Sequence, residues 1–203
     1  MEGKITRSAY LARVISRVTN PCIHSVLILL LIAYTESTNT RVLVGWITTV
    51  LLFLVLLPLA YVYMRTSKGR SDIKLVTNPT IFLKQHSKDI LILGLLLGMP
   101  CLVILLFLEA PSLLICTLAA LLASSIVIAL FNIFYRASYH LAAVTVLVIM
   151  AVLTWGQIML VLLAAIPLIS WAKYRIHEHT PAQLATGIAA SVAVTAVTLY
   201  LLG

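Results

Sequence analysis

The sequence predicts an all-α fold: a polytopic membrane helical bundle of about six to seven transmembrane helices. First, the 203-residue chain is 62% hydrophobic and 10% charged, whereas ordinary globular proteins are about 25% charged. Second, apolar runs near the ~20 residues that a bilayer requires recur along it. Third, apolar backbone in lipid must be helical, because its amides otherwise lack hydrogen-bond partners. We therefore expect a single integral-membrane domain, residues 1–203, in the cell membrane.

Polar or turn-forming residues bound each expected segment. A basic, amphipathic N-terminus, residues 1–20, precedes the first segment, and Pro21 suits a helix start there. The largest polar stretch, the basic loop 65–89, separates the second segment from the third. Shorter interruptions separate the others, and the first, fifth and sixth segments are short enough to be tilted pairs buried in the bundle. The expected segments are 22–35, 42–64, 90–108, 112–135, 139–153, 158–171 and 181–203.

Positive charge is expected on one membrane face. Counting the segments in order places thirteen of the fourteen Lys and Arg residues on that face and leaves only Arg41 on the other. The positive-inside rule makes the basic face cytoplasmic. Bases at membrane edges favour membrane lipids or phosphorylated lipids as partners, and no nucleic acid is expected. The sequence leaves the oligomeric state open.

Two histidines, His140 and His179, stand where apolar segments begin on this face. Thr180 and Gln183 have the spacing of a capping box, and Ser138 is a candidate N-cap for the helix that contains His140. Helix N-termini attract anions and disfavour an imidazolium, so a neutral, nucleophilic histidine is favoured there. Histidine at a membrane interface also commonly bonds only to water, and the pattern by itself leaves that reading open.

Lys173 and Arg175 precede His179 by six and four residues. A cation in that position stabilises negative charge on a phosphoryl group, although anchoring at the interface explains a single base equally well. Metal ligands are few near His177 and His179, so no metal and no other cofactor are expected. Hydroxyl side chains inside the segments are expected to bond to their own helix or to a neighbouring one. They are Ser124, Ser125, Thr145, Thr154 and Ser191.

Three short stretches of this pattern resemble the motifs of the type 2 phosphatidic acid phosphatase superfamily. Residues 137–140, Ala-Ser-Tyr-His, resemble its second motif, PSGH. Residues 172–183 resemble its third, SRxxxxxHxxxD, with the same spacing from the base to His179 and from His179 to Gln183. Residues 70–79, which include Lys74, are a loose counterpart of its first motif, KxxxxxxRP. The resemblance implies a helical membrane enzyme with its three motifs on one face.

Carried over by position, the resemblance makes His179 the nucleophile that forms a phosphohistidine and His140 the general acid. It assigns the substrate phosphate to Lys173, Arg175, Ser138 and Lys74, and the orientation of the nucleophile to Gln183. The implied substrate is a lipid or isoprenoid phosphate.

The sequence departs from the family pattern at three places. Gln183 stands where the family has Asp, Tyr139 where it has Gly, and the first motif has no Arg-Pro pair. These departures keep two alternatives open. One is a catalytically inactive relative that binds anionic lipid, and the other is a small transporter or channel subunit.

Overall fold

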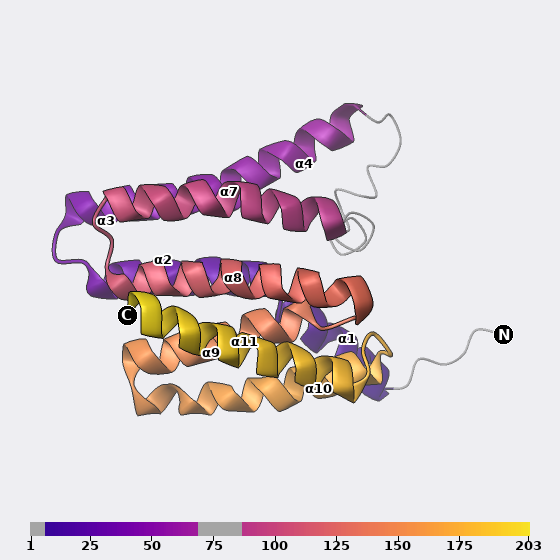
Figure 1. The fold of residues 1–203 in the computed structure, drawn as a ribbon. Coiled ribbons are helices and arrows are strands. Elements are labelled where there is room, and N and C mark those ends of the chain that lie inside the picture. The colour runs from indigo at the N-terminus through magenta and orange to yellow at the C-terminus, as the bar shows by residue number, and fades with distance from the viewer. Residues whose placement is uncertain (1–6, 69–86) are drawn as a thin grey trace. The chain divides into compact units, whose positions relative to one another are not determined.

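The computed structural model describes residues 7–68 and 87–203, and within those ranges all regular structure is helical (Figure 1). The all-α prediction is confirmed. A π-helix, η1 (Leu52–Leu56), connects α3 to α4, and a 3₁₀-helix, η2 (Gln157–Ala164), precedes α10. The α-helices are α1 (Arg7–Val18), α2 (Pro21–Glu36), α3 (Thr40–Leu51), α4 (Leu57–Lys68), α7 (Ser87–Phe107), α8 (Ser112–Phe134), α9 (Tyr139–Trp155), α10 (Ala165–Arg175) and α11 (Pro181–Leu202).

Four helical stretches in the described part of the chain are long and apolar enough to cross a membrane. They are Thr40–Tyr61, Ser112–Phe134, Gln157–Arg175 and Pro181–Leu202. A fifth is added if α1 and α2, which are bent by 42°, form one span. This number is below the six to seven expected: α9 is apolar but has only 17 residues, and α7 is counted only over Gly94–Phe107, although the whole helix has 21 residues. The sequence analysis counted runs of apolar residues, whereas a helix that crosses the membrane must also be unbroken. The helix α9 ends at Gly156, whose φ is 79°.

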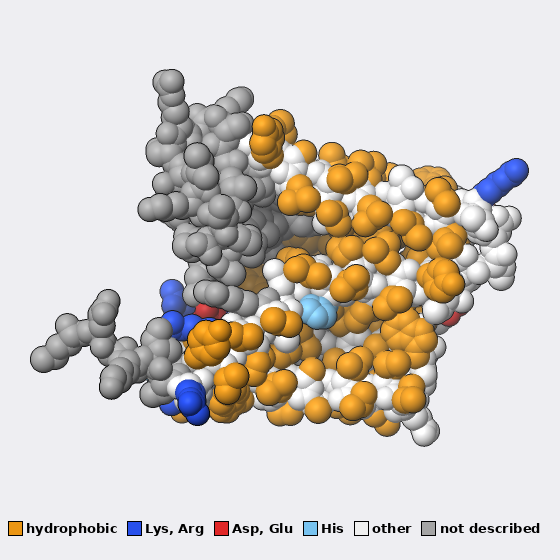
Figure 2. All heavy atoms as spheres, turned by 180° about the vertical axis from the view of Figure 1, so that it is seen from behind, with side chains coloured by type: hydrophobic (Ala, Val, Ile, Leu, Met, Phe, Trp, Pro, Cys, Tyr) orange, Lys and Arg blue, Asp and Glu red, His pale blue; other side chains and the backbone are white. Residues whose placement is uncertain are grey.

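Large apolar side chains cover much of the described surface (Figure 2). Phe134 is 92% exposed, Tyr200 89% and Phe107 83%. In the face shown in Figure 2, the few charged side chains lie at its margins. Such a surface suits lipid rather than water as the surrounding solvent, since soluble monomers rarely expose large contiguous apolar patches. The structure therefore supports the expectation of a membrane protein with transmembrane helices.

The chain divides into two compact units, which are described separately. One unit comprises Met1–Ile32 and Ser112–Gly203, and the other comprises Ala33–Pro111. The expected single domain over residues 1–203 stays a prediction. The candidate site residues that the structure describes all belong to the first unit.

In the first unit, α8, α9 and α11 pack against one another, η2 and α10 pack on α9, and α1 packs on α10. Leu141, Ile169 and Leu184 belong to one buried apolar cluster that joins α9, α10 and α11. Most hydroxyl groups within these helices bond to their own helix, as expected: Ser125, Thr145, Thr154 and Ser191 donate to carbonyls three or four residues earlier. The hydroxyl of Ser124 is the exception among these five: it is buried and has no hydrogen-bond partner in the described part of the chain.

In the second unit, α3, η1 and α4 form a continuous helix with a π-helical turn, and α7 packs against it. Pro58 explains that turn, because its nitrogen cannot donate to the carbonyl four residues earlier. The N–H of Leu57 instead bonds to the carbonyl of Leu52, one residue further back. The indole N–H of Trp46 donates to the carbonyl of Leu108 at 3.1 Å, which fixes the end of α7 beside α3.

Candidate functional site

The start of α11 has the capping box that the sequence predicts. The hydroxyl of Thr180 accepts a hydrogen bond from the N–H of Gln183 at 3.3 Å, and Gln183 Oε1 accepts one from the N–H of Thr180 at 3.0 Å. Pro181 occupies the first turn, where a missing N–H costs nothing. The box fixes the direction in which the chain enters α11. His179, the residue before the cap, is thereby held at the helix N-terminus.

The start of α9 is capped as expected by Ser138. Its hydroxyl accepts a hydrogen bond from the N–H of Leu141 at 3.4 Å, and the residue is fully buried. Its backbone N–H donates to the carbonyl of Gln183 at 3.3 Å. The hydroxyl predicted to bind a phosphate therefore caps a helix, and its backbone joins the first turns of α9 and α11.

Gly187 permits this contact between α9 and α11, and sequence reasoning missed it. A Cβ atom at Gly187 would lie 2.7 Å from the carbonyl oxygen of Ser138, closer than such atoms approach in proteins. The available signal was an isolated glycine one helical turn beyond Gln183 in an apolar helix, since small residues allow close packing of membrane helices.

The loop between α10 and α11 folds the chain back over Lys173. The N–H of Glu178 bonds to the carbonyl of Lys173 at 3.1 Å, and the N–H of His177 bonds to that of Tyr174 at 3.0 Å. These are the two bonds of a Schellman motif, which requires a left-handed residue after the helix. His177 supplies that residue, with φ of 56°. The motif brings the carboxylate of Glu178 next to the ammonium of Lys173.

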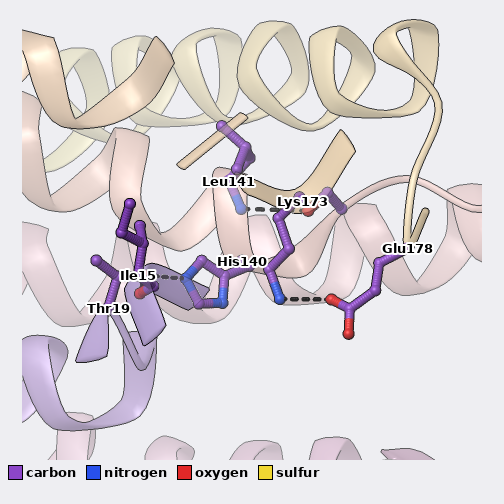
Figure 3. A network of polar contacts seen from close by, with 7 residues as sticks. Ile15, Thr19, His140, Leu141, Lys173 and Glu178 are labelled. Carbon is purple, nitrogen blue, oxygen red and sulfur yellow. Dashed lines mark hydrogen bonds and ion pairs between the residues drawn. The ribbon is translucent and has the colours of Figure 1, made fainter. Parts of the chain in front are cut away.

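Lys173 and Glu178 form an ion pair with 2.7 Å between Nζ and Oε2. Lys173 is 9% exposed, so this charge is largely shielded from water. Sequence reasoning had assigned Lys173 to a substrate phosphate and had not paired it with Glu178. The cation interacts electrostatically with the rings of both His140 and His179, but the carboxylate of Glu178 already occupies one side of it (Figure 3).

His140 is half-buried at the start of α9 and faces α1 (Figure 3). Its Nε2 lies 3.3 Å from the hydroxyl oxygen of Thr19, and that hydroxyl lies 2.7 Å from the carbonyl oxygen of Ile15. A hydroxyl has one proton to donate, and the shorter distance assigns it to Ile15. Nε2 of His140 therefore carries the proton in its contact with Thr19. The charged groups of Lys173 and Glu178 are both close enough to interact electrostatically with this ring.

His179 is half-buried, and its Nδ1 has no hydrogen-bond partner among the described residues. Burial lowers the pKa of His179 below its ordinary value of 6.5, and the ammonium of Lys173 lowers it further. The carboxylate of Glu178, the backbone of Arg136 and the side chain of Gln183 act in the opposite direction. The ring is thus held towards its neutral form, and its Nδ1 makes no hydrogen bond to the described residues.

Arg175 and Lys74, the remaining predicted phosphate ligands, are not seen to join this cluster. The Nη2 and Nε atoms of Arg175 lie 3.1 and 3.3 Å from the hydroxyl of Ser8 in α1. Lys74 lies outside the described residues. The described part of the chain contains no group of three or more His, Cys, Asp and Glu side chains arranged to hold a metal ion.

An apolar groove of about 300 Å³ runs between α10 and α11 close to this cluster. Trp171 and Tyr174 line it on α10, and Pro181, Leu184 and Ile188 line it on α11. The unit therefore holds two histidines, one lysine and one glutamate at the helix ends, next to an apolar groove. Comparisons of the chain with protein-family models, curated proteins and solved structures found no match.

Proposed function

We propose that this protein is a membrane-embedded phosphatase that acts on a lipid or isoprenoid phosphate through a phosphohistidine intermediate, as a divergent relative of the type 2 phosphatidic acid phosphatases. The observation that carries the proposal is the buried Nδ1 of His179, at a capped helix N-terminus, which has no hydrogen-bond partner among the residues that the structure describes. Buried polar atoms are nearly always hydrogen-bonded, so an exception calls for an explanation. A phosphoryl group that binds and reacts at this nitrogen provides one.

The proposed reaction has two steps. A ring nitrogen of His179 attacks phosphorus, so that a P–N bond forms, the P–O bond to the lipid alcohol breaks, and His140 gives the leaving oxygen a proton. Water then attacks phosphorus, so that a P–O bond forms and the P–N bond to His179 breaks, His140 takes up a proton from the water, and inorganic phosphate leaves. A lowered pKa favours the neutral nucleophile that the first step needs. Lys173 and the N-terminal amides of α11 stabilise the developing negative charge.

The lipid tail and the membrane topology complete the proposal. The apolar groove between α10 and α11 would accommodate part of the tail. All seven apolar segments would cross the cell membrane, with the basic face in the cytoplasm. The 17 residues of α9 extend about 26 Å at 1.5 Å per residue, close to the ~30 Å of a hydrocarbon core.

The Lys173–Glu178 ion pair favours a second candidate function, an inactive relative that binds anionic lipid. In this alternative, Glu178 keeps the cation from the phosphate of a bound lipid, so lipid would bind at the basic face without reacting. Arg175, whose exposed guanidinium donates to the hydroxyl of Ser8, would serve as the headgroup contact.

The experiment is a labelling reaction with the full chain in lipid nanodiscs. The protein is incubated with phosphatidic acid or an isoprenyl phosphate carrying ³²P, and quenched in alkaline detergent, which preserves the P–N bond. We expect retained label that acid releases, and release of inorganic phosphate.

Two histidine variants provide the comparison. His179→Ala should lose both label and phosphate release, whereas His177→Ala, which removes an exposed histidine two positions away, should keep them. Label that persists in His179→Ala would rule out the nucleophile. Neither label nor phosphate release in the unmodified chain, together with retained lipid binding, would favour the inactive relative.

A further inference from the structure

The first helix, α1, has three distinct faces. Ser8 and Ala12, together with Thr19 just after the end of α1, lie on the side that packs against the rest of its unit, where Ala12 is fully buried. The hydroxyl of Ser8 contacts Arg175, and that of Thr19 contacts His140. Small and polar residues, rather than large apolar ones, therefore join this helix to the protein, and its rotation about its own axis is fixed.

The large apolar side chains of α1 point away from the protein. Tyr10 is 63% exposed, Leu11 54%, Val14 39% and Val18 67%. Their spacing of three to four residues places them along one side of the helix. A stripe of this kind stays favourable only against lipid or another apolar partner.

Two exposed arginines border this stripe, Arg7 at its N-terminal end and Arg13 along its side. A Lys or Arg at the centre of a membrane helix costs about 2.5–3.5 kcal/mol, so α1 does not cross the hydrocarbon core. Beside anionic lipid, in contrast, each base contributes about 1 kcal/mol of attraction. An apolar stripe bordered by arginines is the pattern of a helix that lies in the headgroup region.

The length of α2 fixes the depth of α1. The 16 residues of α2 extend about 24 Å at 1.5 Å per residue, about 6 Å less than the hydrocarbon core. α1 is bent by only 42° from α2, so its last turn would make up this difference. Val18 would then lie among the acyl chains, while Arg7 lies among the headgroups.

We propose that α1 is an oblique interfacial helix that binds an anionic bilayer surface, with its apolar stripe in the lipid and Arg7 and Arg13 on lipid phosphates. The inference does not depend on catalysis. It assigns a partner, anionic lipid, to a face of the chain other than the histidine cluster. Because the opposite side of α1 contacts His140 and Arg175, α1 lies between the bound lipid and that cluster.

The first test measures depth at successive positions of the stripe. Nitroxide labels are placed singly at Leu11→Cys, Val14→Cys and Val18→Cys in the full chain with Cys22→Ser, since the two other cysteines are buried. Accessibility to oxygen and to a water-soluble nickel chelate gives the depth of each label in nanodiscs of phosphatidylcholine and phosphatidylglycerol. We expect Val18 to be deepest, Val14 intermediate and Leu11 shallowest, with an Arg13→Cys label close to water. Equal depth at the three positions, or exposure of all three to water, would overturn the proposal.

The second test measures the preference for anionic lipid. A fluorophore at Val14→Cys is quenched by spin-labelled phosphatidylglycerol or by spin-labelled phosphatidylcholine, and the ratio of the two reports local enrichment. We expect stronger quenching by phosphatidylglycerol, and a fall of up to about fivefold in its preference for each arginine removed in Arg7→Gln and Arg13→Gln. Arg41→Gln, which removes an exposed arginine from α3, should leave the ratio unchanged. An unchanged ratio in the Arg7→Gln/Arg13→Gln chain, with unaltered thermal unfolding, would refute anionic-lipid binding.

Discussion

The ammonium of Lys173 has three charged or titratable neighbours: the carboxylate of Glu178 and the rings of His140 and His179. The balance among these groups determines two measurable quantities. One is the protonation of His179, and the other is the affinity of Lys173 for an added phosphate. Both can be changed by substitutions at position 173 or 178 that preserve the shape of the loop.

The pKa of His179 should respond in opposite directions to the two substitutions. Lys173→Met removes a cation that lowers it, so the pKa should rise, while Glu178→Gln removes an anion that raises it, so the pKa should fall. Imidazole ¹⁵N shifts in a pH titration, assigned with His179→Asn, measure both. A lowered pKa also means that the folded chain binds this proton less tightly than the unfolded chain does. His179 should therefore destabilise the fold as pH falls below 6.5, and His179→Asn should remove that part of the pH dependence of thermal unfolding.

Glu178→Gln should also strengthen the binding of a phosphomonoester. The carboxylate competes with the phosphate for the ammonium of Lys173, and a partly exposed ion pair is worth up to about 1 kcal/mol. We expect the affinity for a soluble, short-chain lipid phosphate to rise about fivefold, measured by calorimetry in detergent. Glu109→Gln, which changes an exposed carboxylate in the turn after α7, serves as the control. Weaker binding in Glu178→Gln would contradict the competition.

At the scale of elements, the contact between α9 and α11 depends on the absence of a side chain at Gly187. In Gly187→Ala a methyl group would meet the carbonyl of Ser138, 2.7 Å from its position. We expect a loss of about 1–3 kcal/mol in the free energy of unfolding, seen as a lower midpoint of thermal unfolding in detergent. Gly94→Ala is the matched control, because nothing lies within 4 Å of its added carbon. Equal midpoints for the two variants would show that α11 can shift without cost.

Local sequence patterns predicted the ends of the helices well, but they could not predict contacts between residues that are distant in the sequence. The cap of α9 at Ser138 and the capping box of α11 were predictable because each involves residues within three positions of one another. The contact of Thr19 with His140 joins residues 121 positions apart, and no local sequence pattern predicts it.

The ion pair of Glu178 was missed for a related reason. It depends on a Schellman motif whose left-handed residue is His177 and not the glycine that usually marks this turn. The predicted roles of Lys74 and Arg175 stay predictions, the first because it lies outside the described residues.

At the scale of the whole molecule, the number of spans determines the side on which each connection lies. Seven spans place Glu109 outside and Arg136 in the cytoplasm when the N-terminus is cytoplasmic. Five spans, with Gly94–Phe107 and α9 not crossing, reverse both positions but leave the C-terminus on the same side. Single cysteines at Glu109→Cys and Arg136→Cys, in a chain without its three native cysteines, should react with an impermeant maleimide from outside only at position 109. Reaction at position 136 alone would establish the five-span topology.

The loop that holds Glu178 against Lys173 has a consequence for selectivity. An anion that approaches this cation must replace a carboxylate that is covalently part of the chain and therefore always present at high local concentration. A phosphodiester headgroup, with one negative charge, offers the ammonium little more than Glu178 already does. A phosphomonoester approaches two negative charges at neutral pH and gains more from the exchange. If Lys173 binds a lipid phosphate as proposed, the ion pair sets a charge threshold: we expect the resident carboxylate to exclude the diester lipids of the bilayer and to yield to monoesters.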